Sequence, residues 1–372
     1  MILLTPGPTP IHPRVQEALA RPMRGHLDPE VLLCNRNIRS LLQTLFDAGE
    51  GALVAALAGS GSLAMEAGFA NLVSRGDAVL VLANGSFGER MAEMARVYGL
   101  EAGIVHFPPN APVDPAQVRE ALSRKAYRLV AMVHGETSTG VINPASEIAA
   151  LAREHGALFM LDVVTTAAML PFSMQKLGVD YAFTGSQKCL SAPPGLAPFG
   201  LSARVRASLT GAQSWYTDFR RVEQYWEKEG YHCTAPVLLH FALEEALRLA
   251  LEEGLEARHQ RAQELYAATL AVLEETGFSA YAPKEARLHT VLVVRPPANL
   301  SEAEIRRGLY CQGIAVAGGI GPTAGQVLRL GLMGEAARRE NFSAFFRALG
   351  KTLGVTGLDL AFEERLTAAT AS

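Results

Sequence analysis

The sequence predicts an α/β protein with a large domain, built on a mostly parallel sheet covered by helices, and a smaller C-terminal α/β domain. From about residue 50, short apolar runs alternate with segments of helical pattern, and polar residues directly follow those runs. Continuous apolar runs are typical of strands that are buried on both faces, as in parallel sheets. A length of 372 residues also favours two domains over one core.

The predicted strands of the large domain are separated by helical segments. Strands are predicted at Leu53–Leu57, Ala78–Ala83, Ile104–Phe107, Leu129–Val133, Ala157–Leu161 and Asp180–Thr184. Helices are predicted up to Leu72 and at Glu89–Tyr98, Pro115–Ser123 and Ala145–His155. Sheets of this kind bind ligands at the carboxyl ends of their strands. The polar residues after these strands are therefore expected to meet in one site.

The sequence of the second half of the chain predicts a helical connector between two lobes, followed by a small α/β lobe. A strongly helical stretch runs from Val237 to Glu274, with one break at Gly254. Beyond it, strands are predicted at Thr290–Val294 and Val327–Leu332, and helices at Glu302–Gln312 and Ala337–Leu349. We predict an N-terminal arm over residues 1–20, a large domain over 21–240, and a connecting helix with the small domain over 241–372.

Composition excludes several classes of protein. Hydrophobic residues make up 49% of the chain and charged residues 19%, which argues against disorder. The formal net charge of −3 does not fit a basic nucleic-acid-binding face. The N-terminus lacks the basic start of a signal peptide, and no apolar run approaches the roughly 20 residues that span a bilayer. The four cysteines show no metal-type spacing, so a cytoplasmic location with free thiols is expected; they are Cys34, Cys189, Cys233 and Cys311.

Lys188 and Asp162 stand at the ends of two predicted strands. A lysine amine becomes a good imine nucleophile when desolvation or a nearby charge lowers its pKa. An acid that closes a buried strand can stabilise a protonated pyridine nitrogen, although a cap or a structural ion pair would serve as well. The spacing of 26 positions between them leaves room for one helix and one strand, so the two side chains could reach opposite ends of one ring.

Three further segments follow predicted strands. Gly59–Ser62 lies between a strand and a helix, where backbone amides suit a phosphate, or it is a plain turn. Phe87 could stack on an aromatic ring or belong to the core. The hydroxyls of His134–Gly140 could bond a phenolic oxygen or cap a turn. In the small lobe, Arg329 lies inside an apolar run, so it is either paired with an acid or positioned to bind a substrate carboxylate.

Taken together, these motifs resemble class V aminotransferases, in particular the alanine–glyoxylate and serine–pyruvate branch. The motifs are Gly185–Lys188, Asp162–Val164, His134–Gly140, Gly319–Pro322, Leu328–Gly331, Thr5–Thr9 and Gly25–Glu30. They occur in order over nearly the whole chain. The resemblance implies an aspartate-aminotransferase-like fold of pyridoxal-phosphate fold type I, working as a homodimer whose active site is shared across the interface.

The resemblance also implies roles for single residues. Lys188 would form an imine with pyridoxal 5′-phosphate, and Asp162 would pair with the pyridine nitrogen. Phe87 and Val164 would cover the two ring faces, and Thr137 would lie near the phenolic oxygen. Arg329 would bind the substrate carboxylate. The phosphate would be held by Ser60, Gly61, Ser62 and Gln187, and in the neighbouring subunit by Tyr231 and Thr234; Ser62 departs from relatives with His at that position.

The expected activity is the transfer of an amino group from alanine or serine to glyoxylate or a similar 2-oxo acid. A ureidoglycine–glyoxylate aminotransferase is the main alternative, and residues around His26 and Cys233 are expected to separate the two. A cysteine desulfurase would need a thiol on a mobile loop, whereas Cys311 lies in a predicted helix. A non-catalytic subunit would predict a damaged site, and a dinucleotide oxidoreductase would need a glycine fingerprint that the chain lacks.

Overall fold

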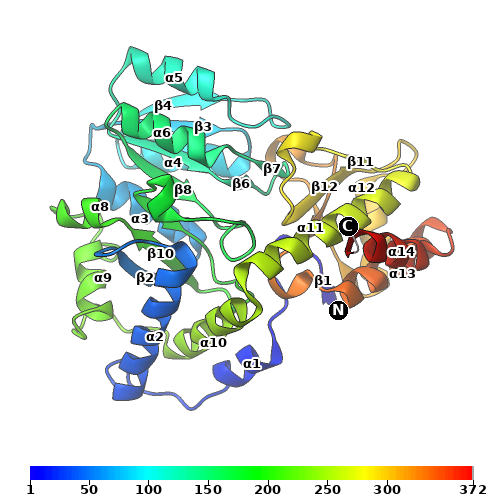
Figure 1. Cartoon of the computed structure of the whole chain (residues 1–372), viewed down its shortest axis with the longest axis horizontal. Coiled ribbons are helices and arrows are strands. Elements are labelled where there is room, and N and C mark those ends of the chain that lie inside the picture. Colours follow the sequence, from blue (N-terminus) through cyan, green and yellow to red (C-terminus); the bar gives the residue numbers. More distant parts are fainter. Residues whose placement is uncertain (371–372) are drawn as a thin grey trace.

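A computed structural model describes residues 1–370 of the chain (Figure 1). Its larger sheet has seven strands in the order β2-β10-β9-β8-β5-β3-β4. The strands are β2 (Leu53–Ala58), β3 (Ala78–Ala83), β4 (Glu101–His106), β5 (Leu129–Val133), β8 (Leu158–Asp162), β9 (Tyr181–Phe183) and β10 (Leu196–Leu201). All six predicted strands of the large domain are therefore present, with small shifts at their ends.

Strand β10 was not predicted, and it makes the sheet mixed. It pairs antiparallel with β2 on one side and with β9 on the other, whereas the remaining neighbours in the sheet are parallel. Because β10 reverses direction between β2 and β9, those two strands run the same way. All the other strands therefore end at one edge of the sheet.

Helices connect these strands and pack on the sheet. They are α3 (Gly61–Leu72), α4 (Ser86–Val97), α5 (Pro115–Arg124) and α6 (Ala145–Glu154). The predicted helix at Glu89–Tyr98 begins three residues earlier in the structure, at Ser86. Apart from the seven-stranded sheet, β6 (Gly135–Glu136) and β7 (Val141–Ile142) form a short hairpin after β5. This hairpin positions the polar segment that follows β5.

The small lobe has its own sheet of four strands, in the order β11-β12-β15-β14. These strands are β11 (Ser279–Ala280), β12 (Val291–Arg295), β14 (Ala317–Gly318) and β15 (Leu328–Gly331). Helices α12 (Glu302–Cys311), α13 (Arg339–Leu353) and α14 (Leu358–Thr370) complete the lobe. Helix α14 was not predicted; it packs against α11 and α13.

The predicted helical connector is two helices, α10 (Val237–Glu253) and α11 (Leu255–Glu275), with the break at Gly254 as expected. Figure 1 shows α11 running from the large sheet to the small lobe. Helix α2 (Pro29–Phe46) was missed, although Asp28 caps it and Pro29 starts it. The N-terminal residues form β1 (Ile2–Leu3) and α1 (Pro13–Leu19). Along residues 1–370, no helix has the length and apolar character that a bilayer crossing requires.

Candidate active site

A cavity of about 210 Å³ lies at the carboxyl edge of the large sheet. Eight of its ten lining residues were predicted as site residues from the sequence. They are Ser60, Gly61, Ser62, Phe87, Asp162, Val164, Gln187 and Lys188. The other two, Met65 and Arg90, were not predicted. The strand order therefore brings together side chains that are up to 128 positions apart, between Ser60 and Lys188.

Lys188 lies in the turn that follows β9. Its backbone amide donates to the carbonyl of Gly185 at 3.2 Å, which closes the turn and points the side chain into the cavity. Burial lowers the pKa of the Lys188 amine, and the positive charges of Arg329 and Arg90 act in the same direction. A lysine with a lowered pKa has more neutral amine, the form that attacks a carbonyl carbon.

Asp162 is the last residue of β8 and is fully enclosed. Its register places it opposite Val133 of β5 and Phe183 of β9, at the carboxyl end of three strands. The carboxylate accepts a hydrogen bond from the amide of Val164 at 2.8 Å. The pKa of Asp162 is raised to about 7, chiefly by burial and to a smaller extent by the nearby Glu136, whereas the Val164 amide opposes the shift. The positive charges of Lys188 and Arg90 act on this carboxyl without a described hydrogen bond to it, so a cationic ligand group would be its natural partner.

The start of α3 forms an open anion cradle in this cavity. Ser60 is the N-cap residue, but its side chain makes no capping hydrogen bond, so amides of the first turn are left for a ligand. A Cβ on Gly61 would lie 3.0 Å from Cγ2 of Val164, which shows how closely the backbone approaches the cavity wall. The side-chain amide of Gln187 lines the same cavity and has two N–H donors for a phosphate. These features fit a phosphate-bearing cofactor.

Arg90 is an additional cation in the cavity. Its Nη1 atom donates to Oγ of Ser62 at 3.0 Å, and its guanidinium lies 4.6 Å from the centre of the Phe87 ring. Sequence reasoning missed this residue because an arginine on an amphipathic helix usually faces solvent. The spacing of three positions from Phe87 on α4 was the one available signal, since residues three apart share a helix face.

Glu136 fixes the helix that carries Phe87 and Arg90. It is fully buried, and its carboxylate accepts from the amides of Phe87 and Gly88 at 3.0 and 3.3 Å. It also accepts from the amide and hydroxyl of Ser138 at 3.0 and 2.6 Å. A carboxylate at the N-terminus of α4 stabilises the helix and holds its first turn against the cavity.

Arg329 lies on β15 and is 7% exposed. Its Nε atom donates to the carbonyl of Gly318 at 2.7 Å, and Nη1 donates to the carbonyl of Thr137 at 3.3 Å. These bonds fix the guanidinium between the two lobes. Burial lowers its pKa, and the negative charge of Glu136 partly offsets that effect. Thr137 itself is buried at this junction and does not line the Lys188 cavity.

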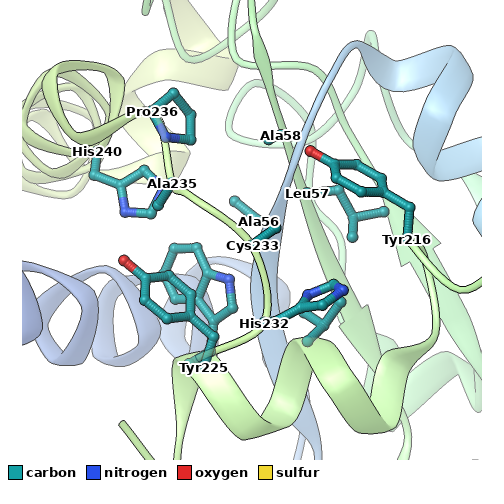
Figure 2. A pocket seen from close by; sticks show the side chains of 12 residues that line it. Ala56, Leu57, Ala58, Tyr216, Tyr225, His232, Cys233, Ala235, Pro236 and His240 are labelled. Atoms are coloured by element: carbon teal, nitrogen blue, oxygen red, sulfur yellow. The ribbon is translucent and has the colours of Figure 1, made fainter. Parts of the chain in front are cut away.

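Tyr231 and Thr234 lie away from the Lys188 cavity of their own chain. The Tyr231 side chain is exposed and its ring is 5.3 Å from that of His26. Thr234 lines a surface groove together with Met23 and His26. Between them, His232 and Cys233 lie beside Tyr216 and the end of β2, as Figure 2 shows. Neither His26 nor Cys233 reaches the Lys188 cavity within one chain.

The fold and this site define a lysine-centred cofactor enzyme of the α/β class. A buried amine, a buried acid and an open anion cradle surround one cavity, which suits an aromatic cofactor that carries a phosphate. A profile of the family described as aminotransferase class V matches residues 17–339. The chain therefore belongs to the class V aminotransferases, and its cofactor is pyridoxal phosphate.

Named relatives support this assignment over nearly the full length. The chain is 35% identical over 362 residues to an alanine–glyoxylate aminotransferase of Oryctolagus cuniculus, covering 95% of this chain and 92% of that protein. A crystal structure of alanine–glyoxylate aminotransferase from Nostoc sp. superposes with a TM-score of 0.91, at 38% identity and 95% coverage of both chains. That of a ureidoglycine–glyoxylate aminotransferase from Bacillus subtilis superposes with a TM-score of 0.93, at 30% identity, covering 100% of this chain and 98% of the other. The predicted fold class and family are confirmed.

Proposed function

We propose that this chain transfers the amino group of a small amino acid, alanine or serine, to glyoxylate or a similar 2-oxo acid. The observation that carries the proposal is the single cavity in which Lys188 faces Asp162 and the uncapped start of α3. The cavity has a volume of about 210 Å³, and eight of the ten residues that line it are assigned to the cofactor. The names of the relatives support glyoxylate as the acceptor.

Each residue around the cavity has a proposed task. Lys188 forms the covalent link to the cofactor and, once released, moves a proton between the substrate Cα and the cofactor as base and then as acid. Asp162 pairs with the ring nitrogen, and Phe87 and Val164 cover the ring faces. The phosphate is bound by Ser60, Gly61, Ser62 and Gln187. When bound, pyridoxal phosphate delocalises the electron pair that the broken Cα–H bond leaves behind.

A donor–acceptor panel tests the proposed activity. The enzyme with bound pyridoxal phosphate, called the loaded enzyme below, would be assayed with alanine, serine and ureidoglycine as donors, each against glyoxylate and pyruvate. We expect the highest kcat/KM for alanine or serine with glyoxylate, and formation of glycine. A clear preference for ureidoglycine would move the assignment to the alternative that the structural similarity to the Bacillus subtilis enzyme also supports. The absence of transfer from all three donors would contradict the proposal.

We infer that Arg329 binds the substrate carboxylate, because its guanidinium is buried and its described hydrogen bonds go to the backbone carbonyls of Gly318 and Thr137. Replacing it with lysine removes the fork that bonds two carboxylate oxygens at once. KM for alanine is therefore expected to rise on the order of 10²-fold, since each 1.4 kcal/mol of lost binding is a factor of ten. Steady-state kinetics would measure this, with Arg96→Lys on the exposed side of α4 as the control. An unchanged KM would contradict the role.

We also propose a homodimer in which Tyr231 and Thr234 reach the phosphate site of the partner subunit. Two observations support it. The groove that contains Thr234 has a volume of about 600 Å³ and is lined largely by apolar residues. Large apolar side chains near this face are exposed in the single chain, namely Met23, Leu27, Trp215 and Tyr231. Exposed apolar patches of this kind mark interfaces.

Mixed subunits test this sharing. A Lys188→Ala chain and a Tyr231→Ala, Thr234→Ala chain would each be inactive as a dimer of its own kind. In a mixed dimer, one of the two sites has the intact lysine from one subunit and the intact phosphate ligands from the other. Unfolding and refolding the two chains together is therefore expected to restore part of the activity. Activity that stays at the level of the separate variants would argue against a shared site, as would a monomer in light scattering.

Two further proposals concern the domain boundaries and the location of the protein in the cell. We propose the arm at 1–20, the large domain at 21–240 and the connecting helix with the small domain at 241–372. The placement of the two sheets within 53–201 and 279–331 supports this division. A cytoplasmic location is proposed from the four free cysteines.

A further inference from the structure

The N-terminal arm is anchored to the small lobe at one end of the active site. Ile2 and Leu3 form β1, which pairs parallel with β13 (Ile314–Ala315). The carbonyl of Leu4 then accepts from the amide of Gly331 at 2.7 Å. Gly331 lies two positions after Arg329 on β15. The arm therefore starts beside the strand that carries the proposed carboxylate-binding residue.

A few residues later, the arm is anchored to the lysine turn. The amide of Thr9 donates to the carbonyl of Gln187 at 3.0 Å. The hydroxyl of Thr9 donates to the carbonyl of Lys188 at 3.0 Å and lies 3.0 Å from the hydroxyl of Ser191. Thr9 is buried. Because both ends are fixed, the segment between Leu4 and Thr9 has a defined position next to Lys188.

This segment contacts the reactive end of the lysine. Nζ of Lys188 donates a hydrogen bond to the carbonyl of Pro6 at 2.5 Å. Gly7 has a φ of +98°, in the region that favours glycine, and a Cβ there would lie 2.4 to 2.7 Å from Cδ, Nζ and Cε of Lys188. A side chain at position 7 would therefore have to displace the end of the lysine side chain.

We propose that the Pro6 carbonyl is a positioning group of the active site, which holds Lys188 Nζ whenever the amine is not joined to the cofactor. One N–H bond directed at a fixed carbonyl restricts rotation of the amine and leaves its lone pair free to face the cavity. Nζ would then receive the proton that leaves the substrate Cα and would give it up on the cofactor side, while the carbonyl remains unchanged. Orientation of this kind lowers the entropic part of the barrier. The catalytic part of the inference rests on the proposed function of Lys188.

The first test needs no cofactor. Lys188 of the cofactor-free protein would be acetylated competitively across a pH range, and the product measured on its peptide by mass spectrometry. A carbonyl acceptor stabilises the ammonium form more than the amine, so losing it lowers the pKa. Gly7→Ala is expected to shift the labelling midpoint to lower pH. Gly76→Ala is the matched control, because Gly76 has a φ of +88° but nothing within 4 Å of the added Cβ.

The second variant separates loss of the carbonyl contact from crowding by the new methyl group. Thr9→Val removes the hydroxyl contacts that anchor the arm beside Lys188, while the arm still covers the lysine and no atom is added near Nζ. It is expected to shift the labelling midpoint in the same direction as Gly7→Ala. A midpoint like that of the wild type in Thr9→Val would overturn the proposal, and so would identical curves for Gly7→Ala and Gly76→Ala.

The loaded enzyme gives an independent readout. Gly7→Ala is expected to lower kcat by about 10²-fold with little change in KM, since a base displaced by about 1 Å loses a factor of this size. Gly76→Ala should retain the wild-type kcat. An unchanged kcat in Gly7→Ala would refute the positioning role alone. A wild-type enzyme that fails to link the cofactor at Lys188 would refute the proposed function instead, and the labelling experiment would still test the contact with Pro6.

Discussion

Replacing Lys188 with alanine is expected to lower the rate of transfer from alanine to glyoxylate by about 10⁴-fold or more, since both the covalent link and the proton-transferring amine are lost. The other nine residues that line the cavity include no second lysine, and the side chain of Arg90 is a guanidinium rather than a primary amine. No described side chain can therefore take over the task. The rate would be measured as pyruvate formed from alanine.

A chemical readout accompanies the rate. Treating the loaded wild type with borohydride should leave the cofactor attached to the peptide that contains Lys188, and the alanine variant should carry no attached cofactor. The exposed Lys351 on α13 provides the control, because Lys351→Ala changes a lysine without touching the cavity. Normal turnover by Lys188→Ala, or attachment of the cofactor to another lysine, would disprove the assignment of this residue.

The sequence was most informative where strands are buried and regular. The runs Ala78–Ala83 and Leu129–Val133 are continuous and apolar, because the sheet is covered on both faces, and their ends coincide with the strands β3 and β5. Parallel strands end at the same edge of a sheet, so the polar residues that follow these strands could be expected to lie close together there. The pattern therefore pointed to six residues of the cavity, whereas Val164 and Gln187 were implied by the resemblance to class V aminotransferases; the six are Ser60, Gly61, Ser62, Phe87, Asp162 and Lys188.

Strand β10 could not be predicted from its local sequence. It contains Pro198 and Gly200, which are unusual inside a central strand, and so the segment looks like a loop. The structure accepts them because β10 is enclosed between β2 and β9, and the carbonyl of Pro198 still accepts from the amide of Thr184 at 2.8 Å. The segment is a strand because it pairs with β2 and β9, and this tertiary pairing is not visible in the local sequence pattern.

Two contacts around the site, that of Glu136 with Phe87 and that of Lys188 with Pro6, could not be predicted for a similar reason. Glu136 belongs to a segment that was singled out for its hydroxyls, but the amide of Phe87 that its carboxylate binds lies 49 positions earlier in the chain. The local sequence pattern gives no sign that Glu136 accepts a hydrogen bond from the amide of Phe87. The contact between Lys188 and Pro6 spans 182 positions and depends on a backbone carbonyl, which every residue has. Sequence motifs identify side chains, and the groups that hold those side chains in place appear only in the fold.

Replacing Asp162 is expected to have large effects of opposite sign on the stability of the cofactor-free protein and on the activity of the loaded enzyme. In the cofactor-free protein, burial raises the pKa of Asp162 to about 7, whereas an unfolded chain titrates near the ordinary value of about 3.9. Between these two pH values the unfolded chain loses a proton that the folded protein keeps. The free energy of unfolding therefore falls as pH rises through this window, by roughly 4 kcal/mol in total. Below the window this contribution to stability is fully present, and above pH 7 it is lost.

Asp162→Asn removes this titration and keeps the acceptor for the amide of Val164. The cofactor-free variant is therefore expected to be more stable than the wild type at pH 8, with the difference shrinking toward pH 4. Urea unfolding at several pH values would measure it, with the exposed Glu340→Gln on α13 as the control. Parallel stability curves for Asp162→Asn and the wild type would show that burial does not shift this carboxyl.

The loaded enzyme should respond in the opposite direction. Asp162 is the only carboxylate among the residues that line the cavity, so a protonated ring nitrogen has no other described partner there. Breaking a buried pair costs about 3–5 kcal/mol, which corresponds to roughly 10²–10⁴-fold in cofactor affinity or in kcat/KM for alanine. A structural aspartate would lower stability and activity together when replaced. An asparagine variant that is more stable without the cofactor and less active with it would show that the buried charge at position 162 is kept for the cofactor, at the expense of the stability of the empty fold.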